Sequence, residues 1–278
     1  MTQTTTSPAP AITKVIGEQS LKIADLSVIN ADKLAANDPA ATETLLKAAK
    51  SPGFFYLSFD EPASENIAKD INTLYEACEK YFAQSGDEKM KDFREGVDRG
   101  YKKGPGHESF EIAREEKDTI TLPTKLVPYS NVLRDFSSVC DNYSRICLRA
   151  LSAGLGLEGQ SHLENTHNPN DPNDSGLKLL SGPTEPTVAD VPNTTHTDGG
   201  SITFLWCGKW ASQVQIPETK EWLWIEPTSR CVLVNIANSL QKQTDGTLHS
   251  PVHRVTQPTD GVEDRFMVSY FFRPSKTF

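Results

Sequence analysis

Two histidines and one aspartate in the second half of the chain constrain its fold more than any other feature. His196 and Asp198 are separated by one residue, so in an extended segment both side chains project to the same side. His253 is distant in sequence and can join them only if a sheet folds back on itself. Two imidazoles and one carboxylate bind non-haem Fe(II) on one face and leave positions open for other ligands. An isolated His-X-Asp also occurs by chance in surface turns, so the surrounding sequence decides whether it is interpreted as a metal site.

Short strand-like segments surround this motif. They are rich in apolar, β-branched and aromatic residues, and Gly, Pro and Asp-Gly sequences interrupt them. The segments are 202–206, 222–225, 231–236 and 265–272. Many short strands with regular breaks predict a double-stranded β-helix, or jelly roll.

The first half of the chain predicts helices that pack against this core. Apolar residues recur at helical spacing from Ile67 to Phe82 and over 131–151, and a shorter helix is predicted at 41–50. The predicted class is therefore α+β, mainly β. We expect a flexible arm at 1–18, part of which can pack as an edge strand. A helical and strand region at 19–160 and the catalytic jelly roll at 176–278 follow.

Four segments together resemble the iron(II)/2-oxoglutarate-dependent dioxygenases, in the branch of isopenicillin N synthase and many fungal biosynthetic enzymes. They are HTDGGSIT at 196–203, VNI at 234–236, SPVHRV at 250–255 and GFFYL at 53–57. The resemblance covers most of the chain. It implies that His196, Asp198 and His253 bind the iron.

The same resemblance assigns Arg265 to the distal carboxylate of 2-oxoglutarate, a role that suits the planar, permanently charged guanidinium. It implies Fe(II), O2 and 2-oxoglutarate as reactants, with ascorbate as a possible reductant. The implied reaction oxidises an unactivated C–H bond of a small organic molecule by hydroxylation, desaturation, ring formation or rearrangement. Succinate and CO2 are released, and secondary-metabolite biosynthesis is the expected setting.

Two departures from the family pattern bear on the co-substrate. Met267 stands two residues after Arg265, where relatives have a serine that helps to hold the co-substrate, and a thioether donates no hydrogen bond. Residues 177–183 replace a segment that carries a tyrosine before proline, where only the hydroxyl of Ser181 could substitute. These changes keep open an alternative, an Fe(II)-dependent oxidase that uses no 2-oxoglutarate, as in isopenicillin N synthase.

The predicted substrate contacts are Tyr101, Phe110, Trp206 and Arg273. Tyr101 and Phe110 belong to a mixed-polarity stretch, 99–121, that lies at the pocket mouth in the resembled family; plain structural aromatics are the alternative. Because the sequence stops soon after its last predicted strand, we expect an open active site or a lid formed by other loops or another subunit.

Two non-oxygenase hypotheses compete. A metal-binding jelly roll that senses a ligand would need no Arg265. A zinc hydrolase would need a nearby general base, which the sequence does not offer. In the polar run 162–175, His162 and His167 have no metal-ligand pattern around them and are predicted to be exposed.

Composition limits the classes of binding partner and the cellular location that the sequence allows. An apolar content of 37% over 278 residues can fill a full core. A net charge of −9 with scattered basic residues argues against nucleic-acid binding. Five cysteines without CxxC spacing, no long apolar run and no secretory signal predict a cytoplasmic protein away from membranes. The sequence does not indicate an oligomeric state.

Overall fold

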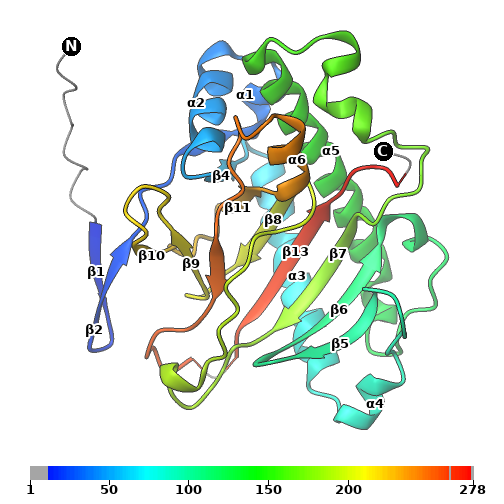
Figure 1. Ribbon diagram of the computed structural model, residues 1–278. Helices are drawn as coiled ribbons and strands as arrows, with labels where there is room; N and C mark the ends of the chain where they lie inside the picture. The colour runs from blue at the N-terminus through cyan, green and yellow to red at the C-terminus, as the bar shows by residue number, and fades with distance from the viewer. Residues whose placement is uncertain (1–11, 263, 277–278) are drawn as a thin grey trace.

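The computed structural model describes residues 12–262 and 264–276, in which two β-sheets face each other (Figure 1). The larger sheet has eight strands in the order β3-β4-β11-β8-β13-β7-β6-β5, and the smaller has five in the order β1-β2-β10-β9-β12. The larger sheet comprises β3 Val28–Asn30, β4 Phe54–Ser58, β5 Gly100–Gly104, β6 His107–Ala113, β7 Gly176–Ser181, β8 Ile202–Cys207, β11 Cys231–Ile236 and β13 Phe266–Phe272. The smaller sheet comprises β1 Ile12–Ile16, β2 Gln19–Ile23, β9 Ser212–Gln215, β10 Trp222–Trp224 and β12 His253–Val255.

The central strands β8 and β11 of the larger sheet bury both of their faces. Side chains alternate across a strand, so one face packs against the smaller sheet and the other against helices. Phe54, Val214 and Leu233 belong to the apolar cluster between the sheets. Ile202, Phe204 and the helices belong to a larger cluster on the opposite face. The predicted jelly roll with helical buttresses is confirmed.

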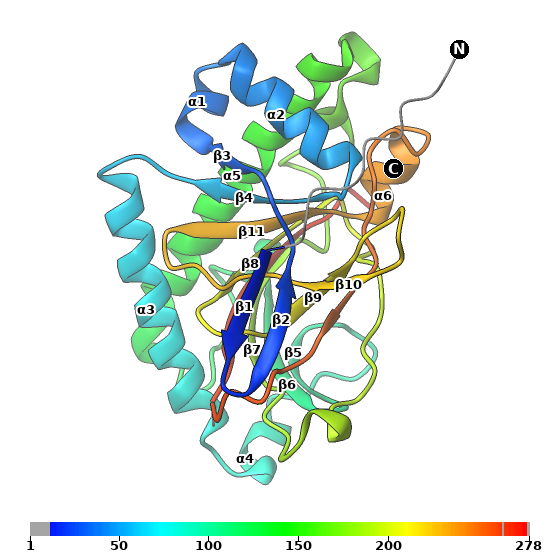
Figure 2. The same cartoon turned by 90° about the vertical axis from the view of Figure 1, so that its left-hand side faces the viewer.

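The helices α3 Ala63–Phe82 and α5 Ser130–Leu155 cover the outer face of the larger sheet, as Figure 2 shows from the side. Apolar residues at helical spacing form the buried stripe of each helix, as the sequence predicts. Gly156 ends α5 in the left-handed conformation, with a φ of 68°. The remaining helices are α1 Ala31–Ala35, α2 Pro39–Lys50, α4 Gly86–Met90 and α6 Asn238–Gln243.

Three segments can be compared with the expectations from the sequence. Residues 12–16 of the predicted arm form β1, which pairs antiparallel with β2 through a turn at Gly17; residues 1–11 lie outside the described part. The predicted stretch 99–121 contains the hairpin β5–β6, which is the edge of the larger sheet. His167 is buried, because its ring stacks on Phe272 and its nitrogens contact hydroxyl groups, so the prediction that it is exposed was wrong.

Candidate active site

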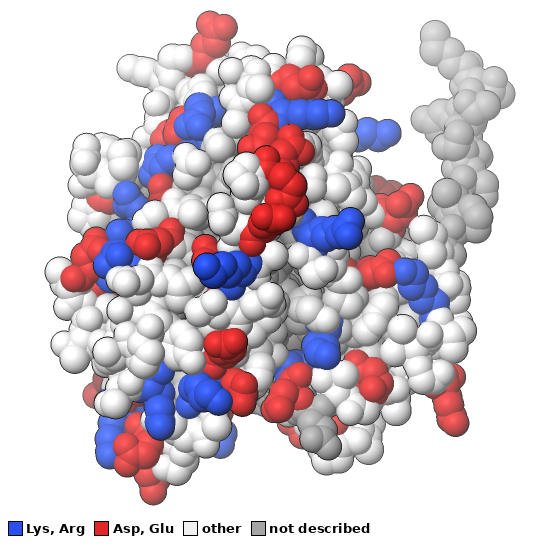
Figure 3. All heavy atoms as spheres, turned by 180° about the vertical axis from the view of Figure 1, so that it is seen from behind, with Lys and Arg blue, Asp and Glu red and all other residues white. Residues whose placement is uncertain are grey.

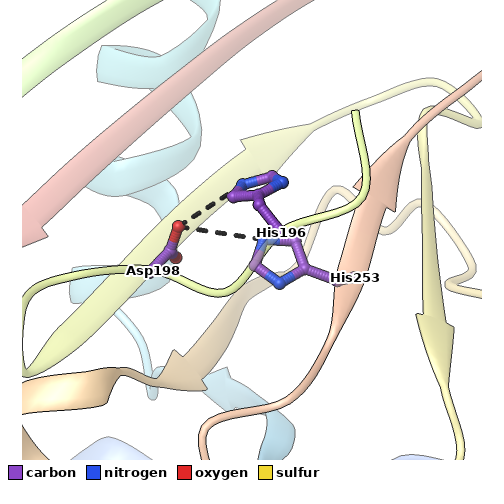
Figure 4. Close-up of side chains that lie close together, drawn as sticks. All are labelled: His196, Asp198 and His253. Carbon is purple, nitrogen blue, oxygen red and sulfur yellow. Dashed lines mark ion pairs between the residues drawn. The ribbon is translucent and has the colours of Figure 1, made fainter. Parts of the chain in front are cut away.

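A backbone bridge between the two sheets brings the predicted metal ligands together. His196 precedes β8 of the larger sheet, and His253 begins β12 of the smaller one. Each backbone N–H of this pair donates to the other's carbonyl oxygen at 3.0 Å. The Nε2 atoms of His196 and His253 lie 3.6 and 3.8 Å from the same oxygen, Oδ1 of Asp198 (Figure 4). One ion can therefore contact all three side chains, whose ligand atoms lie within 4.8 Å of one another.

Hydrogen bonds hold both imidazoles in the orientation that a metal requires. Nδ1 of His196 lies 2.5 Å from the carbonyl oxygen of Thr194, and Nδ1 of His253 lies 3.1 Å from that of Pro251. A carbonyl only accepts, so Nδ1 must carry a proton, and in the neutral ring that binds a metal Nε2 keeps its lone pair. Such partners of a ligating histidine fix its tautomer and raise its basicity.

The carboxylate of Asp198 is held ionised. Burial acts to raise its pKa, but the hydrogen bond from His196 and the charge of His253 outweigh burial and hold the pKa well below its ordinary value. Asn235 on β11 donates from Nδ2 to Oδ2 of Asp198 at 2.9 Å, which leaves Oδ1 toward the histidines. Burial lowers the pKa of His253. A buried carboxylate and a neutral imidazole suit a divalent cation, so this donor set fits Fe(II).

A cavity of about 260 Å³ adjoins this cluster, and His196 is part of its wall. Most of the wall is apolar and includes Leu180, Pro183, Val191, Val255, Met267 and Phe271. Lys178 is the only Lys or Arg that lines the cavity in the described part of the chain. The site thus combines a metal-binding group with a mostly apolar chamber, as expected of a small-molecule pocket.

Comparisons with known proteins agree with this geometry. A model of the 2OG-Fe(II) oxygenase superfamily matches residues 172–274, and a model of the N-terminal region of non-haem dioxygenases in morphine synthesis matches 21–136. The 2-oxoglutarate-dependent dioxygenase gloE of Glarea lozoyensis is 30% identical over 264 residues, which cover 90% of this chain and 79% of gloE. The chain belongs to the 2OG-Fe(II) oxygenase superfamily. It is an oxidoreductase that uses Fe(II) and 2-oxoglutarate.

Two further proteins similar to this oxygenase are fungal. The 2-oxoglutarate-dependent dioxygenase FG08081 of Gibberella zeae is 29% identical over 274 residues, covering 92% of this chain and 82% of its own. A full-length Neurospora crassa protein, solved in complex with alpha-KG and 5-formyluracil, has a TM-score of 0.74 at 23% identity, covering 93% of this chain and 86% of its own. At that identity, the structural similarity shows the shared fold.

Arg265 of the oxygenase does not line the cavity, although the resemblance places it at the co-substrate. Its side chain is fully buried and forms an ion pair with Asp260. Nη1 donates to the carbonyl oxygen of Pro183 at 3.2 Å, and Pro183 itself lines the cavity. Arg265 therefore lies just behind the wall.

Three of the predicted substrate contacts face the helices instead of the cavity. Tyr101 and Phe110 pack against Tyr81 of α3, and Phe110 pairs with Leu179, whose neighbours Lys178 and Leu180 line the cavity. Trp206 packs against Phe136 of α5, at a centroid distance of 4.8 Å. Strand alternation turns these rings away from the metal ligands. The structure supports the alternative interpretation of Tyr101 and Phe110 as structural aromatics.

The fourth predicted substrate contact, Arg273, does not line the cavity itself but contacts residues beside it. It donates from Nη1 to Oε1 of Glu111 at 3.0 Å and lies over the ring of Phe271. Oε2 of Glu111 lies 2.7 Å from Nζ of Lys178. Sequence reasoning missed Lys178; its signal was one charge within the otherwise mostly apolar strand β7.

Proposed function

We propose that this oxygenase oxidises an unactivated C–H bond of a small organic molecule in the cavity beside His196. The arrangement that carries the proposal is the His196–Asp198–His253 group at the wall of a mostly apolar chamber with one cation. In a hydroxylation, one atom of O2 enters the product and the other enters succinate, while 2-oxoglutarate loses CO2. Desaturation or ring formation would use the same reactants.

Each residue has a proposed task. Fe(II), when bound by His196, Asp198 and His253, supplies the activation of O2. Asn235 and the carbonyl oxygens of Thr194 and Pro251 orient these ligands. Apolar wall residues such as Val255 and Phe271 exclude water and hold the reacting carbon in position. Arg265 is the proposed partner of the distal carboxylate of 2-oxoglutarate.

Lys178 is the proposed contact for a polar or acidic group of the substrate. Lys178 and Arg273 share the single carboxylate of Glu111, whose side chain is only 3% exposed. The cluster therefore carries an excess positive charge beside the cavity. A partly buried cation of this kind favours an anionic or strongly hydrogen-bond-accepting group.

The setting that we propose is fungal-type secondary metabolism in the cytoplasm. Relatives from Glarea lozoyensis and Gibberella zeae are 2-oxoglutarate-dependent dioxygenases, and all five cysteines are free thiols. No helix in the described ranges is both long and apolar enough to span a membrane. On the face seen in Figure 3, acidic and basic side chains are interspersed and the basic ones form no continuous patch, which supports a small-molecule substrate over nucleic acid.

Turnover with a panel of small organic acids tests the proposal. The protein is incubated with Fe(II), 2-oxoglutarate and O2, and mass spectrometry follows both succinate and the panel compound. We expect a compound-dependent rise in succinate, matched by a product that gains one oxygen atom or loses two hydrogen atoms. The His253→Ala variant is the negative control. Product without succinate would instead support the Fe(II) oxidase that uses no 2-oxoglutarate.

A further inference from the structure

Arg265 and Asp260 form a preformed ion pair behind the cavity wall. The side chain of Arg265 is 0% exposed and that of Asp260 is 8% exposed. Nη2 of Arg265 donates to Oδ1 of Asp260, which also accepts the backbone N–H of Val262 at 3.2 Å. Gly261, with a φ of 67°, allows the chain to turn directly after Asp260. The pair is therefore built into the segment itself.

This pairing leaves Arg265 few free donors. A guanidinium has five N–H groups. Nε donates to the carbonyl oxygen of Trp210, and Nη1 donates to those of Pro183 and Val262. With Asp260 on Nη2, one N–H has no acceptor among the described residues. A carboxylate binds a guanidinium best through two parallel N–H bonds, which this geometry does not leave open.

Neither Met267 nor Ser181 supplies a hydroxyl donor beside Arg265. Met267, two residues after Arg265, lines the cavity, and a thioether donates no hydrogen bond. Ser181 pairs with Phe266, whose side chain packs against the helix-side cluster. By strand alternation, Ser181 faces the helices together with Leu179. Arg265 therefore gains no hydroxyl partner from these two residues, and the carboxylate of Asp260 already occupies its Nη2.

We propose that Asp260 is an internal competitor for the distal carboxylate of 2-oxoglutarate and thereby sets the affinity of this oxygenase for its co-substrate. The inference rests on the proposed role of Arg265. Binding of 2-oxoglutarate through two N–H bonds requires Asp260 to leave Nη2, and the lost ion pair subtracts from the affinity. Oδ2 of Asp260 is buried without a hydrogen-bond partner, so the carboxylate gains solvation when it moves.

An anaerobic titration of the Fe(II) protein with 2-oxoglutarate measures this affinity. The visible charge-transfer absorption of a keto acid chelated to Fe(II) reports binding without turnover. Asp260→Asn keeps the shape and one acceptor oxygen but removes the charge. We expect it to bind 2-oxoglutarate about tenfold more tightly, because hydrogen bonds between charged groups are about twice as strong as neutral ones. Asp264→Asn, an exposed change of the same charge, is the matched control and should leave the affinity unchanged.

A second ligand separates the contribution of the distal carboxylate from that of the chelating end. 2-Oxopentanoate has the same chain length and chelating end but no distal carboxylate, so its affinity should be the same in the wild type and in Asp260→Asn. Unchanged or weaker binding of 2-oxoglutarate by Asp260→Asn would overturn the proposal and make Asp260 a residue that positions Arg265. If Arg265→Met also leaves 2-oxoglutarate binding unchanged, the proposed role of Arg265 fails as well.

The wild type alone supplies a further measurement, in case Asp260→Asn does not fold. Competition by Asp260 predicts that the wild type binds 2-oxoglutarate less than about tenfold more tightly than 2-oxopentanoate. A preference above about a hundredfold would show that the guanidinium is fully available to the ligand, and would overturn the proposal.

Discussion

Asn235 links the larger sheet to the metal ligands. Its Nδ2 atom donates to Oδ2 of Asp198, and its side chain is almost fully buried on β11. The VNI segment attracts attention in the sequence, but only the structure shows that its asparagine contacts the carboxylate. A residue in this position acts on the metal by fixing which oxygen faces it.

Replacement of Asn235 by alanine should therefore weaken iron binding. We expect the Kd for Fe(II) to rise about 10- to 100-fold, as is typical when the partner of a metal ligand is lost. An anaerobic competition titration against a chelating indicator measures it. Asn238→Ala is the control, because among the described residues that side chain bonds only the hydroxyl of Thr197; equal losses in both variants would contradict the assigned role.

His167 makes stability depend on pH. Burial lowers its pKa from the ordinary 6.5 to about 4. Between these values the unfolded chain binds the proton and the folded protein does not. The stability that the protein has above pH 6.5 therefore decreases as the pH falls toward 4, because protonation favours the unfolded chain. The lost stability amounts to about 3 kcal/mol.

Denaturant unfolding of the wild type and of His167→Gln at several pH values checks this prediction. Glutamine keeps a polar group near Ser201, which contacts Nε2 of His167, but does not titrate. We expect the free energy of unfolding of the variant to fall less steeply between pH 7 and pH 4. Parallel profiles for the two proteins would show that His167 does not carry the effect.

At the scale of elements, the turn between α2 and β4 supports the segment that carries His253. Gly53 has a φ of 85°, and its N–H donates to the carbonyl oxygen of Ala48 at the end of α2. A Cβ atom at Gly53 would lie 2.2 Å from the carbonyl oxygen of His249 and 2.9 Å from Cδ of Pro251. Only glycine fits there, because the turn and the approach to residues 249–251 both require it.

Gly53→Ala should accordingly harm both stability and metal binding. We expect a loss of about 1–3 kcal/mol in the free energy of unfolding, together with weaker binding of Fe(II), because residues 249–251 must shift. Chemical denaturation and metal titration measure the two effects. Gly208→Ala is the control, since no atom lies within 4 Å of its added Cβ and its φ is not positive; a similar loss there would refute the steric explanation.

At the scale of the whole molecule, the metal ligands connect the two sheets. His196 and Asp198 lie beside β8 of the larger sheet, and His253 lies on β12 of the smaller one. The backbone bridge between His196 and His253 makes the same connection without a metal. An ion at this point binds the folded state and not the unfolded one, so it should stabilise the entire jelly roll.

Fe(II) should therefore raise the unfolding temperature of the protein. At a free metal concentration about 100 times the Kd, the expected gain in the free energy of unfolding is about 2.7 kcal/mol. Anaerobic calorimetry with and without a chelator measures it. His253→Ala should unfold at the same temperature in both conditions, whereas an equal Fe(II) effect in that variant would place the ion elsewhere.

The sequence by itself determined the jelly roll, the two long helices and the grouping of His196, Asp198 and His253. Local periodicity predicts the strands and helices, and the resemblance of short motifs to a known family implies the grouping of the three ligands. Register between distant strands decided the rest. It turned Tyr101, Phe110 and Trp206 toward the helices and placed Lys178 opposite Glu111. No local pattern encodes these contacts, because a shift of one residue between paired strands exchanges the two faces of a sheet.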